Sequence, residues 1–179
     1  ERASIAELFE KYFSFKLTPE TSREELIELA KIQKIETTPD DSWNDIFHRL
    51  FVSKIELQLG IKAPVVIYNF PPSQAALARL TADGWADRFE LFWNGLEIAN
   101  AFHELNDPKE QLKRFEADQK RRIERGRTPL EIDQNFMQAL HAGLPPSAGI
   151  ALGLDRLFMG VFGIREITKA RFFGVGHQT

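Results

Sequence analysis

The sequence contains no cysteine, which removes several kinds of chemistry at once. Without a thiol the chain forms no disulfide, gives no thiolate to a metal ion and has no cysteine nucleophile. Histidine is also scarce. The four histidines lie far apart in the sequence, and none has a partner at the spacing that zinc ligands use. We therefore expect neither a zinc site nor a Ser-His-Asp catalytic arrangement. The histidines are His48, His103, His141 and His177.

Long apolar runs are missing as well. No stretch approaches the roughly 18 residues that a membrane-spanning helix needs. The N-terminal residues show no signal-peptide pattern either, so we expect no association with a membrane. The chain begins with Glu1 rather than with Met, and we therefore expect a fragment or a processed product of a longer protein.

Excess positive charge is absent, since the net charge is −3 and the isoelectric point is about 5.9. No global basic field favours nucleic acid as a partner. Residues 107–127 are an exception, with 8 basic and 5 acidic side chains. We interpret this stretch as the solvated face of a helix. The alternative is a patch that binds nucleic acid or an acidic partner.

What the sequence does contain is enough apolar material for one core. Its 179 residues are 43% hydrophobic and include 15 Phe, which predicts a single domain over residues 1–179. The first 60 residues have helical spacing of apolar side chains, and Ser22 and Ser42 are candidate N-caps. The helices predicted here cover residues 3–15, 22–35 and 42–59.

Residues 61–173 have a different pattern, dominated by β-branched and aromatic runs. Residues 65–70 are predicted to form a buried strand, and Asn94-Gly95 joins two further strand-like runs in the strongest short-range hairpin signal. The order of elements predicts an α+β fold, with an antiparallel β-sheet flanked by helices. The other predicted elements are strands at 88–93, 96–102 and 149–154, and helices at 73–80, 108–125, 131–142 and 155–162.

The hairpin places two acidic side chains together. A regular ladder pairs Phe92 with Glu97 and Glu90 with Ala99, so that Glu90 and Glu97 share one face of the sheet. Two neighbouring carboxylates repel each other unless water or a cation separates them, and Mg²⁺ typically takes one or two carboxylates plus phosphate oxygens. Spacing alone favours the other interpretation, a solvent-exposed sheet face with scattered acids.

Glycines mark a third feature near the C-terminus. Gly149 and Gly153 lie in a strand-like run, where glycine usually indicates close approach of a ligand or of another backbone. Arg156 follows at the start of a helix, where its guanidinium could stack on a purine or clamp phosphate oxygens. The alternative is an ordinary surface pair between Arg156 and Asp155.

Four ordered blocks together resemble the C-terminal half of the catalytic domain of class II lysyl-tRNA synthetases, over roughly residues 1–173. Within this family, residues 73–78 and 99–105 resemble the branch that attaches (R)-β-lysine to elongation factor P. The tRNA enzymes usually carry Ser-Pro-Leu-Ala and Gly-Asn-Gly-Phe-Ser-Glu-Leu there, and Ala101 departs from both patterns. The blocks are Arg88-Phe-Glu-Leu-Phe, the run from Gly95 to Asp107, Gly143-Leu-Pro-Pro-Ser-Ala-Gly, and Gly153-Leu-Asp-Arg, which resembles motif 3.

The resemblance implies roles for particular residues. Glu90 and Glu97 would hold Mg²⁺ and the phosphates of ATP, while Gly153 and Arg156 would contact the nucleotide, with Arg156 as the catalytic arginine. The amino-acid pocket would be lined by Ala99, Asn100, Phe102 and Glu104, with Glu104 pairing with a substrate ammonium group.

Regular strand alternation conflicts with this pocket, because it puts Glu97 and Ala99 on one face and Asn100, Phe102 and Glu104 on the other. One substrate cannot contact both faces. We therefore predict a β-bulge or a twist at residues 98–100.

The reaction that the resemblance implies is ATP-dependent adenylation of lysine or β-lysine, followed by transfer to a lysine of elongation factor P. The intact parent would be a cytoplasmic homodimer. Class II motifs 1 and 2 are not visible in the chain, so we expect it to be inactive alone. Two alternatives stay open: a fragment of a lysyl-tRNA synthetase that acts on tRNA-Lys, and a non-catalytic module derived from a synthetase that binds an amino acid or a protein.

Overall fold

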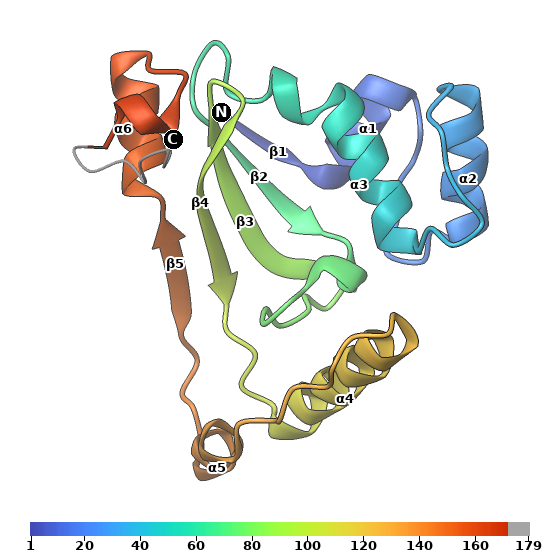
Figure 1. Ribbon diagram of the computed structural model, residues 1–179, viewed down its shortest axis with the longest axis vertical. Helices are drawn as coiled ribbons and strands as arrows, with labels where there is room; N and C mark the ends of the chain where they lie inside the picture. The colour runs from blue at the N-terminus through green and yellow to red at the C-terminus, as the bar shows by residue number, and fades with distance from the viewer. Residues whose placement is uncertain (172–179) are drawn as a thin grey trace, which may run out of the picture.

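The computed structural model describes residues 1–171, so His177 lies outside the described part. Its centre is a five-stranded sheet in the order β1-β2-β3-β4-β5 (Figure 1). β1 pairs with β2 in parallel, and the other neighbours are antiparallel. The strands are β1 (Arg2–Ser4), β2 (Val65–Phe70), β3 (Ala86–Trp93), β4 (Leu96–His103) and β5 (Ala148–Leu152).

The sheet confirms the predicted α+β class but is mixed rather than wholly antiparallel. The difference comes from residues 2–4, because residues 3 and 4 were predicted to begin a helix. Their backbone pairs with β2 instead, and the amide of Val66 donates to the carbonyl of Glu1 at 3.0 Å. Tertiary pairing therefore overrides the helical spacing for these residues, and the helix begins only after Ser4.

Three helices follow the predicted ranges with shorter ends: α1 (Ile5–Phe13), α2 (Arg23–Ile32) and α3 (Trp43–Lys54). Each begins with a capping box. The serine hydroxyl accepts from the backbone N–H three residues later, and the acidic side chain of that later residue accepts from the backbone N–H of the serine. The pairs are Ser4 with Glu7, Ser22 with Glu25, and Ser42 with Asp45.

These helices cover one face of the sheet and form the core with it. Phe9 and Phe47 stack at 5.3 Å between ring centroids, and Phe51 meets Phe92 of β3 at 6.4 Å. Side chains of β2 on the same face, Val65 and Ile67 among them, complete the cluster. The buried aromatic rings fix the position of β3 relative to the helices.

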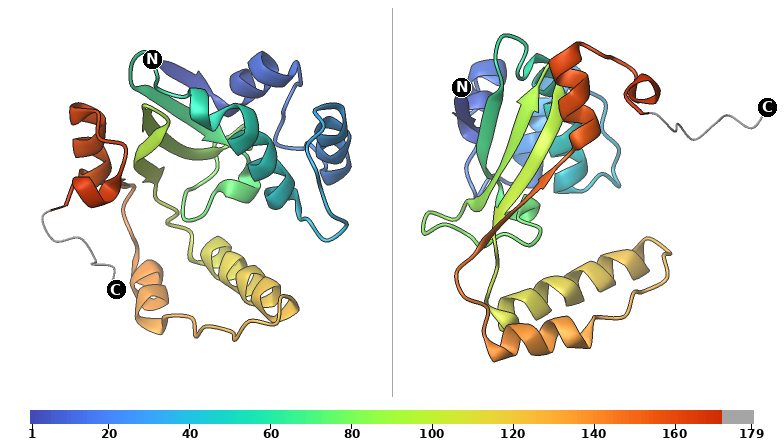
Figure 2. Two further views of the ribbon diagram at one scale, coloured as in Figure 1. Left: turned by 45° about the horizontal axis from the view of Figure 1, so that its top comes forward. Right: turned by 90° about the vertical axis from the view of Figure 1, so that its left-hand side faces the viewer.

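The second half of the chain extends away from this core. α4 (Pro108–Glu124) and α5 (Gln134–Ala142) pack against each other below the ends of the strands (Figures 1 and 2), with Phe115 and Phe136 6.0 Å apart. α6 (Leu154–Phe162) follows β5. We predicted α6 to be buried, but Leu154 is 72% exposed and Phe162 is 65% exposed. Among residues 1–171, no helix has the length and apolar character needed to cross a membrane.

The helix predicted at 73–80 is also wrong. The structure has only a 3-10 turn at Pro72–Gln74, followed by isolated bridges from Ala78 to Glu104 and from Leu80 to Ala86. Arg114 of α4 donates to the carbonyls of Ala76 and Ala78 at 3.0 and 2.7 Å. Arg114 and the isolated bridges thus occupy backbone groups that a helix would use for its own hydrogen bonds. Two other 3-10 turns are Glu56–Gln58 and Ile167–Lys169.

Gly60 lies in the turn between α3 and the sheet, and a substitution there tests how closely this turn packs against β3. Its φ is +69°, and a Cβ added there would lie 2.5 Å from the carbonyl oxygen of Phe92. We expect Gly60→Ala to lower the free energy of unfolding by about 2 kcal/mol or more, measured by urea denaturation. Gly126 has a similar φ of +66° but nothing within 4 Å of the added Cβ. Gly126→Ala should cost only about 1 kcal/mol, and equal losses would contradict this account of Gly60.

Candidate nucleotide and amino-acid site

The hairpin β3–β4 carries a β-bulge at Ile98. Trp93 pairs with Leu96 and Phe92 with Glu97, but Leu91 then pairs with Ala99 rather than with Ile98. The predicted irregularity at 98–100 is therefore confirmed, whereas the regular pairing of Glu90 with Ala99 is wrong.

The register shift decides which side chains share a face. Glu90 now lies opposite Asn100, and Arg88 lies opposite Phe102. Because side chains alternate along a strand, Asn100 and Phe102 fall on the same face as Glu90 and Glu97. The bulge thus brings together the residues that were expected to bind the nucleotide and most of those expected to bind the amino acid.

Ala99 is the exception. It pairs with Leu91 on one side and with Leu152 on the other, and it is buried on the opposite face of the sheet. The structure therefore does not bring its side chain to the face that carries Asn100 and Phe102. The extra residue at 98 turns Asn100 onto the face that carries Glu90 and Glu97. Because side chains alternate along the strand, it also turns Ala99 onto the opposite face.

The bulge also anchors the turn before α6. The amide of Gly153 donates to the carbonyl of Ile98 at 2.9 Å. One turn later, Arg156 donates to the backbone carbonyl of Glu97 at 2.9 Å, and its guanidinium lies 3.5 Å from the Glu97 carboxylate. Arg156 is 50% exposed and Glu97 36% exposed, so both have a side open to a ligand. Gly153 acts here through its backbone N–H, since an added Cβ would meet nothing closer than 3.5 Å.

Glu90 lies deeper, in an ion pair with Arg88. Both side chains are largely buried, with 14% and 8% of their area exposed. Arg88 also donates to the carbonyl of Gln74 at 2.8 Å and lies over the ring of Phe70 at 4.3 Å and that of Phe102 at 5.3 Å. The arginine is therefore held on several sides, and it fixes the position of the Glu90 carboxylate.

Burial controls the protonation of this pair. Removal from water and, to a smaller degree, the nearby charge of Glu97 together raise the pKa of Glu90 to about 7, against the attraction of Arg88. Burial also lowers the pKa of Arg88, although both acids oppose that change. Glu90 is therefore an acid whose charge changes near neutral pH, beside a second carboxylate that is better solvated.

The part of this face that is expected to bind the amino acid ends at Glu104. Its carboxylate lies above β5, and a Cβ added to Gly149 would come within 2.5 Å of its Oε1 atom. The lack of a side chain at Gly149 therefore leaves room for this carboxylate. Asn100 has a buried Oδ1 atom without a hydrogen-bond partner in the described part of the chain. An unpaired buried acceptor is costly, so a donor from a ligand would stabilise it.

A magnesium ion fits this donor set. In the described part of the chain no group of three or more His, Asp or Glu side chains could hold a metal ion. Mg²⁺ does not require such a group, because it keeps water and takes phosphate oxygens beside one or two carboxylates. Glu90 and Glu97 provide that number on one face of the hairpin, with Arg156 beside Glu97.

Two residues on this face, Arg88 and Gly149, have neighbours in the structure that the sequence did not indicate. Arg88 was visible as a charge two positions before Glu90, which places both on one face of a strand. Gly149 was singled out as a glycine in a strand, without a partner. Only the pairing of β4 with β5 shows that its neighbour is Glu104.

Residues 4–176 match the family model described as "tRNA synthetases class II (D, K and N)". Because this match covers most of the chain, the protein belongs to the class II tRNA synthetase family, as the four sequence blocks indicated.

Its curated relatives are more specific. The elongation factor P–(R)-β-lysine ligase of Haemophilus ducreyi is 40% identical over 156 residues, which is 86% of this chain and 48% of that protein. The ligases of the same name from Vibrio cholerae and Proteus mirabilis are 47% identical over 137 residues and 41% identical over 157 residues. These alignments cover 75% and 86% of this chain, and 42% and 48% of the relatives. The chain thus spans about half the length of the curated relatives it matches.

The raised pKa of Glu90 predicts how stability depends on pH. Its value of about 7 in the folded chain exceeds the ordinary 4.5, so folding takes up a proton between these values. The stability from this group is full below pH 4.5 and is lost as pH rises through 7, with a slope of at most about 1.4 kcal/mol per pH unit. We expect Glu90→Gln to flatten this slope in urea denaturation series.

The control is Glu116→Gln, which neutralises an exposed acid on α4. It should keep the slope of the unaltered chain. If Glu90→Gln and Glu116→Gln show the same pH dependence, Glu90 does not titrate near neutral pH.

Proposed function

We propose that this chain carries the Mg²⁺-ATP and amino-acid subsites of a ligase that adenylates lysine or β-lysine and transfers it to a lysine of elongation factor P. The observation that carries the proposal is the bulge at Ile98, which puts Glu90, Glu97 and Asn100 on one face with Arg156 beside them. We expect binding by this chain, and turnover only by a full-length enzyme. That enzyme would be a cytoplasmic homodimer.

The nucleotide subsite rests on three side chains. Glu90 and Glu97 would hold Mg²⁺, which neutralises phosphate charge when it is bound. Arg156 reaches Glu97 from the start of α6 and has half of its side chain exposed, which leaves it free to contact a phosphate or to stack on adenine. Arg88 holds Glu90 in place from below, by the ion pair and the bond to Gln74.

The amino-acid subsite adjoins it along β4. Glu104 would accept from a substrate ammonium group, and the unpaired Oδ1 of Asn100 would accept from a second donor. Phe102 would contact the aliphatic part of the substrate. A lysine-type substrate offers two ammonium groups separated by methylene groups, which suits acceptors at both ends of an aromatic contact. Catalysis would come from positioning and charge neutralisation, without a covalent enzyme intermediate.

The acceptor is assigned from the relatives, whose names give elongation factor P as the protein that they modify. The segments at 73–78 and 99–105 support the same branch over the tRNA enzymes. A protein acceptor rather than tRNA-Lys is therefore the form of the proposal that we favour.

Arg156→Ala tests the nucleotide subsite. We expect the substitution to weaken binding of Mg²⁺-ATP roughly tenfold or more, measured by isothermal titration calorimetry, because a charged hydrogen bond to phosphate is lost. Arg165→Ala, in the loop after α6, is the matched control and should bind as the unaltered chain does. Unchanged affinity in Arg156→Ala would remove the nucleotide role of this arginine.

Gly149→Ala tests the amino-acid subsite. The new methyl group would lie 2.5 Å from the Oε1 atom of Glu104, so this carboxylate must move away. Because only the end of a flexible side chain moves, we expect the melting temperature and the affinity for Mg²⁺-ATP to stay the same. Binding of lysine or β-lysine, measured by calorimetry, should weaken on the order of tenfold. Full affinity for both amino acids in this variant would show that Glu104 does not bind the substrate.

A further inference from the structure

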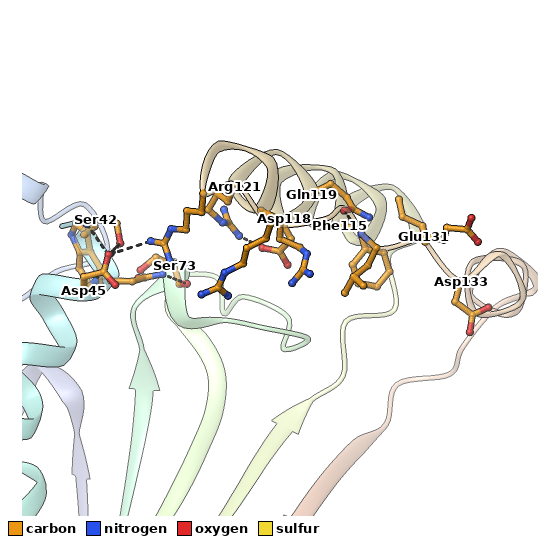
Figure 3. Close-up of a pocket in the computed structure, with 16 residues that line it drawn as sticks. Ser42, Asp45, Ser73, Phe115, Asp118, Gln119, Arg121, Glu131 and Asp133 are labelled. Atoms are coloured by element: carbon orange, nitrogen blue, oxygen red, sulfur yellow. Dashed lines mark hydrogen bonds and ion pairs between the residues drawn. The ribbon is translucent and has the colours of Figure 1, made fainter. Parts of the chain in front are cut away.

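A cleft of about 690 Å³ lies outside the site described above (Figure 3). It is bounded by the start of α3, by Ser73, by the second half of α4 and by the segment that leads to α5. We call it the arginine cleft, because Arg121, Arg122, Arg125 and Arg127 all line it. None of the residues assigned to the nucleotide and the amino acid belongs to its walls.

The four guanidinium groups differ in what already holds them. Arg121 pairs with Asp118 one turn earlier, and Arg125 reaches Asp45 of α3 at 3.2 Å. Arg122 donates to the carbonyl of Thr128 at 3.0 and 3.1 Å. The side chain of Arg127 makes no hydrogen bond or ion pair within the described residues. Three of the arginines are therefore held in place by other groups of the chain, and the charge of Arg127 is available to a partner.

The rest of the lining indicates the chemistry of that partner. Trp43, Phe115, Leu130 and Ile132 supply an apolar surface between the charges. Four acidic residues also line the cleft and equal the arginines in number: Asp45, Asp118, Glu131 and Asp133. A nucleic-acid backbone would meet repulsion from these acids and has no use for an apolar floor. A polypeptide segment is not uniformly negative, so it can place a carboxylate beside an arginine and a hydrogen-bond donor beside an acid, with apolar side chains against the apolar surface.

The cleft also leads toward the candidate site. A second hollow of about 530 Å³ shares Asn44, Ser73, Asp118 and Arg121 with it, and Arg88 is also among its lining residues. Arg88 is the residue that holds Glu90. A segment lying along α4 would thus run toward Arg88, the residue that supports Glu90.

We propose that the arginine cleft docks a carboxylate-bearing, partly apolar segment of the protein acceptor. This inference rests on the proposed function for the identity of the acceptor, and on the cleft for the place and the chemistry of the contact. Under this proposal the basic stretch at 107–127 includes a patch that binds an acidic partner, which is the alternative to a purely solvated helix face. The inner side of α4 carries a binding surface, and only its outer side is a solvated face.

Purified elongation factor P is the probe, and its affinity for the 179-residue chain is measured by biolayer interferometry. We expect Arg127→Glu to weaken binding at least tenfold, because it reverses the available charge in the cleft. Lys120→Glu is the matched control. It makes the same change of charge nearby, on α4, but its side chain is 79% exposed and does not line the cleft. It should change the affinity less than threefold.

Two controls separate this inference from the proposed function and from misfolding. Arg127→Glu should keep the melting temperature of the unaltered chain and its affinities for Mg²⁺-ATP and lysine. If the unaltered chain binds neither Mg²⁺-ATP nor lysine, that result counts against the proposed function alone. The docking proposal is overturned if elongation factor P does not bind the unaltered chain, or if Arg127→Glu and Lys120→Glu weaken binding equally. It is also overturned if tRNA-Lys binds with the dependence on Arg127 that we assign to the protein.

Discussion

The register shift at Ile98 is the constraint on which the rest of the site depends. One extra residue in β4 turns Asn100 and Phe102 onto the face of Glu90 and Glu97. The carbonyl of that same residue accepts from Gly153 and thereby sets the start of α6, from which Arg156 reaches Glu97. A single backbone irregularity therefore aligns one hairpin, one turn and one helix. This is the use that bulges have in sheets, where they redirect side chains near functional sites.

Burial and charge oppose each other at the centre of this arrangement. Glu90 and Arg88 are paired, yet burial holds the pKa of Glu90 near 7 and lowers that of Arg88. A buried ion pair contributes little to stability, because desolvation offsets most of the attraction. Its value here is positional. Aromatic rings and the carbonyl of Gln74 hold the arginine, and the arginine holds the acid that the ligand would meet.

The two halves of the chain divide the proposed task. The helices α1 to α3 and the strands β2 and β3 form a tightly packed aromatic core, which keeps the hairpin rigid. α4 is held to the first half of the chain by Arg114, which binds two carbonyl groups of the 72–80 segment, and by Arg125 at its end, which pairs with Asp45 of α3. The arginine cleft lies at the boundary between these halves, and the proposed nucleotide and amino-acid site lies mainly on the hairpin.

The sequence alone determined most of the local structure and the family. The serine caps, the Asn94-Gly95 hairpin and the 65–70 strand are decided by neighbouring residues, and so they could be read directly. The bulge was also predictable, because the residues assigned by resemblance could not share a face without it. The tertiary structure decided the parallel pairing of β1, the loop at 73–80 and the exposure of α6. It also decided the removal of Ala99 from the pocket, the support of Glu90 by Arg88 and the approach of Gly149 to Glu104. Each of these depends on contacts between segments far apart in the chain, and such contacts leave no periodic pattern in either segment.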